Sequence, residues 1–421
     1  MSDFELKFTL RQHTPLIHFQ HDQPGATLRA TEVKPAFDRY LIQKLTGQTE
    51  PATAVSAMET HPEYRFWLIG KGNKEQPALD YKLSIRATPA IYPIETFNSQ
   101  NQRYQNFPGF FANLTREGTP EAKHFSFSPG PVQVEFHSMD ETLLAAINRH
   151  FADFLAQTNF GSRKTKGFGS FTVEGQRAPA SAFYLTLHCG AGDPTQEWRK
   201  LFQRIDFFHK ALRSGMNNGK GGYLKSPLFL YCKDVLGIQW DKRSVKQHFF
   251  SSAASQHADR HPNADAVTFS APKKSAKDHY YLIRDLLGLA TDSDWRSPEY
   301  NNTKIQKAHA RGAIDRMPSP IIYKPFALGN GQYRVNILLH PIPEAVWGET
   351  FHITSTRHRE KGELALDFPA AGFFSLEAYF AFLCSDAFDI EDLVGAGDRD
   401  TDLITDLFNQ LKHNYQHQNP A

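Results

Sequence analysis

The sequence lacks the long apolar runs that mark membrane proteins, because no stretch of about 18 apolar residues occurs in it. The opening residues, Met1-Ser2-Asp3-Phe4, have neither the charged nor the apolar part of a signal peptide. The three cysteines, Cys189, Cys232 and Cys384, form no Cys-x-x-Cys pair, which disfavours a disulfide framework or a zinc site. We therefore expect a cytoplasmic protein with no membrane partner and with reduced, buried thiols.

Signatures of nucleotide cofactors are also missing. The sequence has no Gly-x-x-x-x-Gly-Lys-Ser/Thr loop, and no Gly-x-Gly-x-x-Gly opens a helix after a predicted strand, so no cofactor is expected. The formal net charge is only +2 for 421 residues, which means that a surface for nucleic acid must come from local clusters of cations. The length, with 40% hydrophobic residues, favours a globular chain of two domains.

One local cluster of cations lies in residues 160–171, FGSRKTKGFGSF. Three glycines surround three cations there, in the order Gly161, Arg163, Lys164, Lys166, Gly167 and Gly169. Glycine allows a left-handed backbone and a close approach to a phosphate or to another backbone, while Arg and Lys supply charge opposite to an anion. The pattern predicts an anion-binding loop, most suitably for a nucleic-acid backbone. A tight helix-to-strand connection with solvated cations is the structural alternative.

Hydrophobic periodicity divides the first part of the chain into strands and helices. Strands are predicted at 4–11, 64–69, 81–88, 132–136 and 167–173, and helices at 31–45 and 140–157, with Thr31 as a helix cap. Residues 46–62 are predicted to be turn-rich and 93–130 to be a long surface excursion. This order of elements is typical of a ferredoxin-like domain, which we assign to residues 1–176.

Residues 177–421 begin to repeat this order and form the second predicted domain. A strand at 183–188, a helix at 195–212, a hairpin of 320–326 with 333–340, and closing helices at 375–383 and 402–412 are predicted. Residues 234–312 are interpreted as a helical insertion, with helices near 244–252 and 280–289. The expected fold class is therefore α+β, with tandem ferredoxin-like domains and a helical insertion in the second.

A second candidate surface for RNA lies early in the second predicted domain. Residues 214–226 combine flexible backbone, two cations and an aromatic ring, through Lys220, Tyr223 and Lys225. Cations bind the phosphates of a single strand, and an aromatic ring can stack on an unpaired base.

Four motifs occur in an order that resembles a known superfamily. They are Thr14-Pro15-Leu16, the helix entry at 28–34 (LRATEVK), the glycine loop at 161–170, and Arg316-Met317-Pro318-Ser319-Pro320 before the hairpin. This order is similar to that of the RAMP superfamily of CRISPR-associated proteins, and the closest likeness is to the two-domain RAMP subunits of type III-B effectors. The glycine loop is the most specific of the four motifs.

The resemblance implies RRM-like domains and an RNA-binding subunit of a ribonucleoprotein complex in antiviral defence, without a cofactor. The bound RNA would be the guide (CRISPR) RNA, the target RNA or both, and the partners would be other effector subunits. The family pattern would place near the RNA the side chains of Arg29, Thr31, Lys34, Arg163, Lys164 and Lys166. We expect the glycine loop, the helix entry and the run at 220–225 to form one composite surface.

Three histidines in nine residues, His13, His18 and His21, leave a catalytic alternative open. Histidine can serve as general base or acid near a ribose 2′-hydroxyl, so the alternative function is a metal-independent endoribonuclease that processes precursor CRISPR RNA. The histidines could also bind a metal ion, but no His-x-x-x-His spacing or acidic cluster accompanies them, and no metal site is expected. A solvated or RNA-contacting loop is the remaining alternative.

Overall fold

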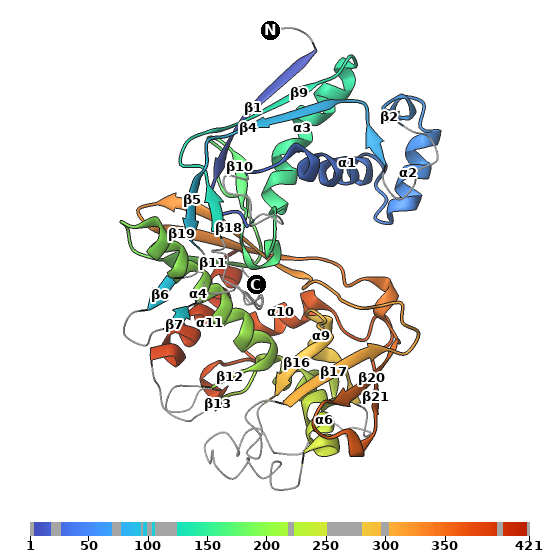
Figure 1. The fold of residues 1–421 in the computed structure, drawn as a ribbon, viewed down its shortest axis with the longest axis vertical. Helices are drawn as coiled ribbons and strands as arrows, with labels where there is room; N and C mark the ends of the chain where they lie inside the picture. The colour runs from blue at the N-terminus through green and yellow to red at the C-terminus, as the bar shows by residue number, and fades with distance from the viewer. Residues whose placement is uncertain are drawn as a thin grey trace. The chain divides into compact units, whose positions relative to one another are not determined.

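The chain divides into two compact units in the computed structural model (Figure 1). The structure describes residues 4–17, 27–69, 77–93, 96–98, 103–105, 124–217, 223–250, 280–295, 303–393 and 399–418. Unit 1 consists of Met1–Ser181, Thr186–Gln203 and Tyr323–Asn336, and unit 2 of Ala182–Leu185, Arg204–Ile322 and Ile337–Ala421. Unit 1 thus contains two segments from later in the sequence, and the second of them lies next to the glycine loop.

Unit 1 is built on a four-stranded antiparallel sheet. Its strands, in the order β10-β1-β9-β4, are Phe171–Val173, Glu5–Gln12, Val132–His137 and Lys82–Arg86. Every neighbouring pair is antiparallel. The chain follows strand, helix, two strands, helix and strand, which is the split βαβ order of a ferredoxin-like unit. The strands predicted near 4–11, 81–88, 132–136 and 167–173 are therefore present.

Two helices supply the core of unit 1: α1 (Ala30–Thr46) and α3 (Glu141–Gln157). Asp140 caps α3 by accepting hydrogen bonds from the backbone N–H groups of Thr142 and Leu143, at 2.8 and 3.0 Å. Fully buried phenylalanine rings from both helices and from β9 meet in the core, where Phe37 lies 5.2 Å and Phe136 lies 4.9 Å from Phe151. Apolar residues of β1 and β9 alternate toward this core, as the sequence pattern predicts.

The connection from α1 to β4 differs from the sequence prediction. Helix α2 (Pro51–Thr60) occupies the stretch that was predicted to be turn-rich, because Glu50 caps it and Pro51 suits its first turn. The predicted strand at 64–69 is mostly the 3-10 turn η1 (Tyr64–Phe66), followed by the short strand β2 (Leu68–Ile69), which pairs with β3 (Ala78–Leu79).

Two small ladders complete unit 1 between β4 and β9. They pair β5 (Ala90–Pro93) with β8 (His124–Phe127) and β6 (Thr96–Asn98) with β7 (Arg103–Gln105). The buried ring of Trp198 packs on Phe125 and Phe127 of β8, at centroid distances of 5.8 and 4.8 Å. Part of this segment, residues 106–123, lies outside the described residues.

A second, three-stranded sheet has the order β11-β19-β18. The divisions of the chain between unit 1 and unit 2 at residues 185/186, 322/323 and 336/337 fall within these three strands. Its elements are β11 (Tyr184–His188), β18 (Ile321–Gly329) and β19 (Gln332–Leu339), with helix α4 (Pro194–Ser214) after β11. The predicted hairpin is confirmed, and the closing helices are α10 (Leu376–Cys384) and α11 (Arg399–Gln418). The mixed helices and sheets confirm the α+β class, whereas a second ferredoxin-like domain stays a prediction.

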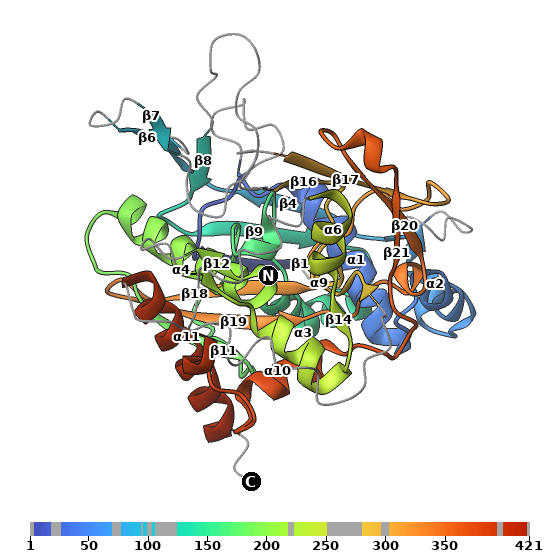
Figure 2. The same ribbon diagram turned by 90° about the horizontal axis from the view of Figure 1, so that it is seen from below.

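The largest sheet of unit 2 has six strands in the order β14-β15-β21-β20-β17-β16. They are Gln239–Trp240, Tyr280–Tyr281, Leu364–Asp367, Thr350–Ser355, Thr303–His309 and Asp292–Trp295. The pairing of β17 with β20 can be followed in Figure 2. Helices α6 (Asp241–Phe249) and α9 (Ile283–Leu286) are the described helices of 234–312. The helices predicted near 244–252 and 280–289 are therefore present with shorter or shifted bounds, but a helical insertion was the wrong prediction, because the described residues also form β14, β15, β16 and β17.

The reason for this error is visible in β17, whose sequence TKIQKAH does not alternate between apolar and polar residues. Its buried positions are Thr303, Ile305, Lys307 and His309, and three of these four are polar. Lys307 is paired with Asp285 at 2.6 Å and His309 with Glu349 at 2.6 Å, so two of the three buried polar side chains are satisfied by partners outside the strand.

Short elements join these parts of the fold. They are η2 (Lys164–Lys166), β12 (Met216–Asn217), β13 (Tyr223–Leu224), α5 (Pro227–Leu230), the π-helix η3 (Tyr231–Leu236), η5 (Glu344–Val346), η6 (Arg359–Lys361) and η7 (Glu391–Leu393). None of the helices in the described residues is long and apolar enough to cross a membrane.

Candidate functional site

The glycine loop connects α3 to β10 through a chain of left-handed backbone conformations. Gly161, Gly167 and Gly169 have φ values of 75°, 94° and 67°, and Arg163 has a φ of 61°. A left-handed conformation is unfavourable for a residue with a Cβ atom, so the surrounding structure must hold Arg163 in place. The 3-10 turn η2 follows, with the Lys166 N–H donating to the Arg163 carbonyl at 2.8 Å.

The segment after β1 binds this loop along its length. The Gly169 N–H donates to the Pro15 carbonyl at 2.8 Å, and the Ser162 N–H donates to the Ile17 carbonyl at 2.7 Å. A Cβ atom at Gly169 would lie 2.0 Å from the Phe160 carbonyl oxygen, and one at Gly161 would lie 2.5 Å from the Ile17 oxygen. Both glycines therefore serve the close approach of protein backbone, which is the structural alternative that the sequence left open for them.

Three consecutive residues of β18 hold the other side of the loop, although they lie more than 150 positions further along the chain. The Asn159 Nδ2 group donates to the Tyr323 carbonyl at 2.8 Å, and the Ser170 hydroxyl donates to the Pro325 carbonyl at 2.6 Å. Lys324 lies between Tyr323 and Pro325 on the same strand. The loop thus has its conformation fixed from two sides within unit 1.

Lys324 is a fully buried cation at the base of the loop. Its Nζ atom donates to the Thr158 carbonyl at 2.8 Å and to the Phe171 carbonyl at 3.0 Å, so it joins the end of α3 to the start of β10. Burial holds the pKa of this amine well below its usual range. A hydrogen-bond donor is favourable at this place, because the carbonyl groups at the C-terminal end of a helix carry partial negative charge.

The entry into α1 lies against the loop through Glu32. The Gly161 N–H donates to Glu32 Oε1 at 2.5 Å. Burial raises the pKa of Glu32, while this hydrogen bond and the nearby charges of Lys164 and Arg29 oppose the shift. Both cations act on one carboxylate, which shows that the helix entry and the loop bring their positive charges together.

We name the loop–helix surface by four cations: Arg29 and Lys164, which both act on Glu32, and Arg163 and Lys166, which lie within two positions of Lys164 in the loop. Lys164 is exposed and the other three are half-buried. Arg29 is the N-cap residue of α1, so the cap prediction for Thr31, which lies exposed in the first turn, was wrong. A guanidinium group has no acceptor atom, which means that it cannot satisfy the N–H groups of this helix end.

Lys34 makes its contacts away from the loop, within unit 1. Its Nζ atom donates to Asp38 Oδ2 at 2.9 Å and to the Leu79 carbonyl at 2.8 Å, and it lies 3.7 Å from the centre of the Tyr81 ring. These contacts favour a structural role for Lys34, although its predicted contact with RNA stays a prediction.

His13 is buried beside the loop, and both of its ring nitrogens have partners. The Ala327 N–H donates to Nδ1 at 3.1 Å, so the neutral ring carries its proton on Nε2, which lies 2.8 Å from the Thr172 hydroxyl. Burial, followed by the charges of Lys324 and Arg11, lowers the pKa of His13 to about 3. This environment gives no support to His13 as a general acid or base near neutral pH. His18 and His21 lie outside the described residues.

The second candidate surface, in unit 2, is described only in part. Lys220 lies outside the described residues. For Tyr223 only the backbone is described, and it pairs with Asn217 in the β12–β13 ladder. Lys225 lies 5.5 Å from the centre of the Phe229 ring. The composite surface that would join this run to the loop stays a prediction.

Sequence reasoning missed Glu32, Asn159 and Lys324 as parts of the site. An acidic residue in the first turn of a helix is an ordinary stabilising feature, so Glu32 gave no separate signal. Lys324 stands in a predicted hairpin strand, and nothing in its local sequence indicates the distant segment that it binds.

The arrangement of unit 1, with its ferredoxin-like strand order and a glycine loop after the second helix, defines a protein of the RAMP class. A family model described as the Cmr1 N-terminal domain matches residues 3–216, and a model described as the Cmr1 C-terminal domain matches residues 223–396. The chain therefore belongs to the Cmr1 family of type III-B RAMP proteins and is a subunit of a multi-protein CRISPR effector complex. None of the curated proteins compared with the chain matches it.

Proposed function

We propose that this Cmr1-family protein holds the phosphate backbone of the guide RNA, the target RNA or both, in the cytoplasm, through the loop–helix surface. The observation that carries the proposal is that Arg29 and Lys164 both lie beside Glu32 at the N-terminal end of α1. The N-terminal end of a helix presents backbone N–H groups and partial positive charge, which suit a phosphate group. The added cations increase this preference, and the carboxylate of Glu32 offsets part of it.

The chemistry of this surface favours binding with little sequence preference. Arg and Lys side chains contact phosphate oxygens, which are the same at every nucleotide. Each phosphate contact with a single strand contributes about −0.7 to the slope of log affinity against log salt concentration. Loss of three such contacts should therefore reduce the steepness of the salt dependence by about 2.

The proposal is tested with the triple variant Arg163→Ala, Lys164→Ala and Lys166→Ala. We expect weaker binding by about the same factor for single-stranded RNAs of different sequence, together with the smaller salt slope. Filter binding at several salt concentrations measures both quantities.

A matched control removes the same charge elsewhere in unit 1. Arg39→Ala, Lys44→Ala and Arg149→Ala change three exposed cations of α1 and α3 outside the loop–helix surface. If the control triple weakens binding as much as the loop triple, only general charge matters and the proposed surface is wrong. Incubation of the pure protein with labelled CRISPR repeat RNA in EDTA tests the endoribonuclease alternative, since intact RNA contradicts metal-independent cleavage of the precursor.

A further inference from the structure

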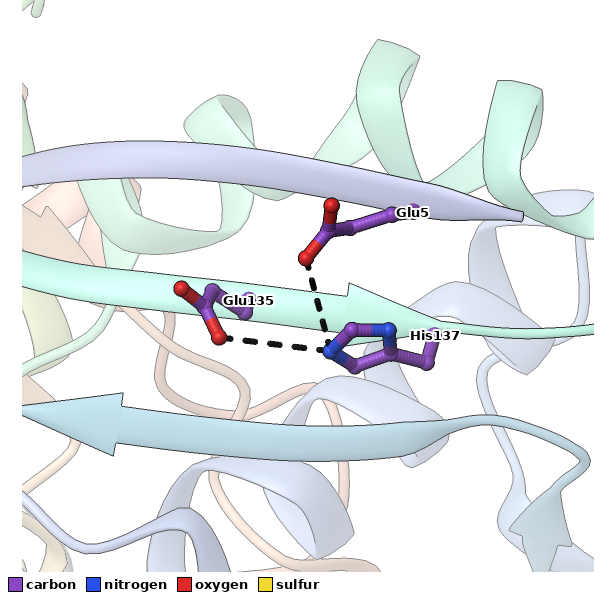
Figure 3. A group of neighbouring side chains, drawn as sticks. All are labelled: Glu5, Glu135 and His137. Atoms are coloured by element: carbon purple, nitrogen blue, oxygen red, sulfur yellow. Dashed lines mark ion pairs between the residues drawn. The ribbon is translucent and has the colours of Figure 1, made fainter. Parts of the chain in front are cut away.

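Two carboxylates and an imidazole lie together on the sheet of unit 1, on the face opposite its core (Figure 3). Glu5 of β1 is directly across from His137 of β9, and Glu135 is two residues before His137 on the same strand. The neighbouring residues Leu6 and Phe136 point the other way, into the core cluster of unit 1. Three potential metal ligands therefore share one face of two adjacent strands.

The distances within this cluster are close to those that a metal ion requires. His137 Nε2 lies 3.8 Å from Glu5 Oε1 and 4.0 Å from Glu135 Oε2, and all three ligand atoms lie within 4.8 Å of one another. Ligand bonds of about 2.1 Å in a tetrahedral site place ligand atoms about 3.4 Å apart. Small side-chain rotations are sufficient to close this difference.

The carboxylates already have cationic neighbours, but these are weak competitors. Lys7 lies 3.1 Å from Glu5 and Arg86 lies 3.8 Å from Glu135, and the two cationic side chains are 59% and 76% exposed. Exposed ion pairs of this kind typically contribute about 0 to 1 kcal/mol. A divalent ion can therefore replace both contacts at little cost.

We propose that Glu5, Glu135 and His137 form a binding site for a divalent metal ion of the zinc type, with water as the fourth ligand. Zinc accepts this mixture of imidazole and carboxylate ligands. The site lies at the opposite end of β1 from the glycine loop, roughly 23 Å along the strand at about 3.3 Å per residue. It is therefore separate from the loop–helix surface, and a bound ion would connect β1 to β9.

The test uses the full chain, treated with a chelator and then titrated with zinc chloride by calorimetry. The variants His137→Ala and the nearly isosteric Glu135→Gln remove one ligand each. Even the loss of a residue that only supports a ligand typically weakens metal binding about 10-fold to 100-fold, so we expect each variant to lose at least about tenfold in zinc affinity. Zinc should raise the melting temperature of the unchanged protein but not of either variant.

Two controls make the test specific. His413 and His417 are exposed one helical turn apart on α11 and could bind zinc themselves, so His413→Ala with His417→Ala should leave the proposed site intact. Lys7→Ala with Arg86→Ala removes the competing cations and should strengthen zinc binding several-fold. Equal zinc binding by the unchanged protein and by both ligand variants would overturn the proposal, and so would a weaker affinity in the Lys7 and Arg86 double variant.

Discussion

The glycine loop of unit 1 and the buried charge cluster of unit 2 hold ionisable groups in two different ways. At the loop, Lys324 is buried with backbone carbonyl groups as its hydrogen-bond acceptors, and His13 is buried in its neutral form. In unit 2, Asp285 and Asp241 are each 1% exposed and are paired with cationic side chains. The first region depends on backbone shape, on backbone acceptors and on a histidine kept neutral, whereas the second depends on paired charges.

The cluster in unit 2 joins helix ends to β17. Lys307 lies 2.6 Å and Arg213 lies 3.1 Å from the carboxylate of Asp285, and Arg284 Nε lies 2.9 Å from Asp241 Oδ1. Burial alone would raise the pKa of Asp285, but Lys307 and Arg213 outweigh burial and hold this pKa below its usual range. The carboxylate therefore stays ionised in the folded protein.

The largest effect is expected from Asp285→Asn. Asparagine keeps the shape of the side chain but leaves the cations of Lys307 and Arg213 without their counter-charge, which typically costs about 3–5 kcal/mol in a buried pair. Urea unfolding measures the change. The matched control is Asp292→Asn, which alters an exposed residue of β16 and should cost less than about 0.5 kcal/mol. Similar costs for the two variants would contradict the contrast between the regions.

At the glycine loop, Gly169→Ala should cost about 2–5 kcal/mol. The left-handed conformation accounts for about 1–2 kcal/mol and crowding for about 1–3 kcal/mol, because the new Cβ atom would lie 2.0 Å from the Phe160 oxygen. Gly175→Ala separates the two causes. Gly175 has a φ of +80°, but among the described residues no atom lies within 4 Å of the place that its Cβ atom would take, so only the smaller cost should apply. Equal losses of thermal stability would show that close packing of the loop is unimportant.

Acid should weaken the loop region before it weakens the charge cluster. The pKa of His13 is about 3 in the folded protein against 6.5 ordinarily, so between these values the unfolded chain binds a proton that the folded protein does not. Stability therefore falls as the pH falls below 6.5, by up to about 2 kcal/mol at pH 5. The contribution of Asp285, whose folded pKa lies below 3.8, is lost only at lower pH.

The variant His13→Gln tests this difference between the regions. Its loss of stability between pH 7 and pH 5 should be smaller than that of the unchanged protein, as measured by urea unfolding at both values. Hydrogen exchange of the backbone amides of β10 should show the same reduced sensitivity to acid. His417→Gln, which changes an exposed histidine of α11, is the control, and an equal reduction in both variants would refute the assignment to His13.

The smallest effect, an increase in RNA affinity of about two- to fivefold, is expected from Glu32→Gln, because one charge at the half-buried edge of this surface contributes up to about 1 kcal/mol. The amide oxygen of glutamine can still accept the Gly161 hydrogen bond, while the negative charge beside Arg29 and Lys164 is removed. Because burial raises the pKa of Glu32, the charge of its carboxylate is less favourable in the folded protein than in the unfolded chain. The variant, which removes this charge, should therefore not lose stability at pH 7. Glu174→Gln, at an exposed position, is the control for filter binding.

Much of the fold could be predicted from the sequence because its signals are local. Strand β1, helices α1 and α3 and the β18–β19 hairpin follow from apolar spacing, capping residues and turn residues within a few positions of each element. Helix α2 was missed because its start depends on a Glu50 cap, a less common choice than Ser, Thr, Asp or Asn. Strand β17 was missed because three of its buried residues are polar, and the partners of Lys307 and His309 lie outside the strand.

The sequence by itself determined the glycine loop, its cations and the RAMP resemblance, since all of these are contiguous motifs. Only the tertiary structure decided what the loop glycines contact, which residues of β18 bind its base, and that Glu32 links it to the entry of α1. The physical reason is that, apart from the contact of Gly169 with Phe160, these contacts join residues more than 100 positions apart. Each depends on the path of the backbone through the folded unit, which no local pattern of side chains records.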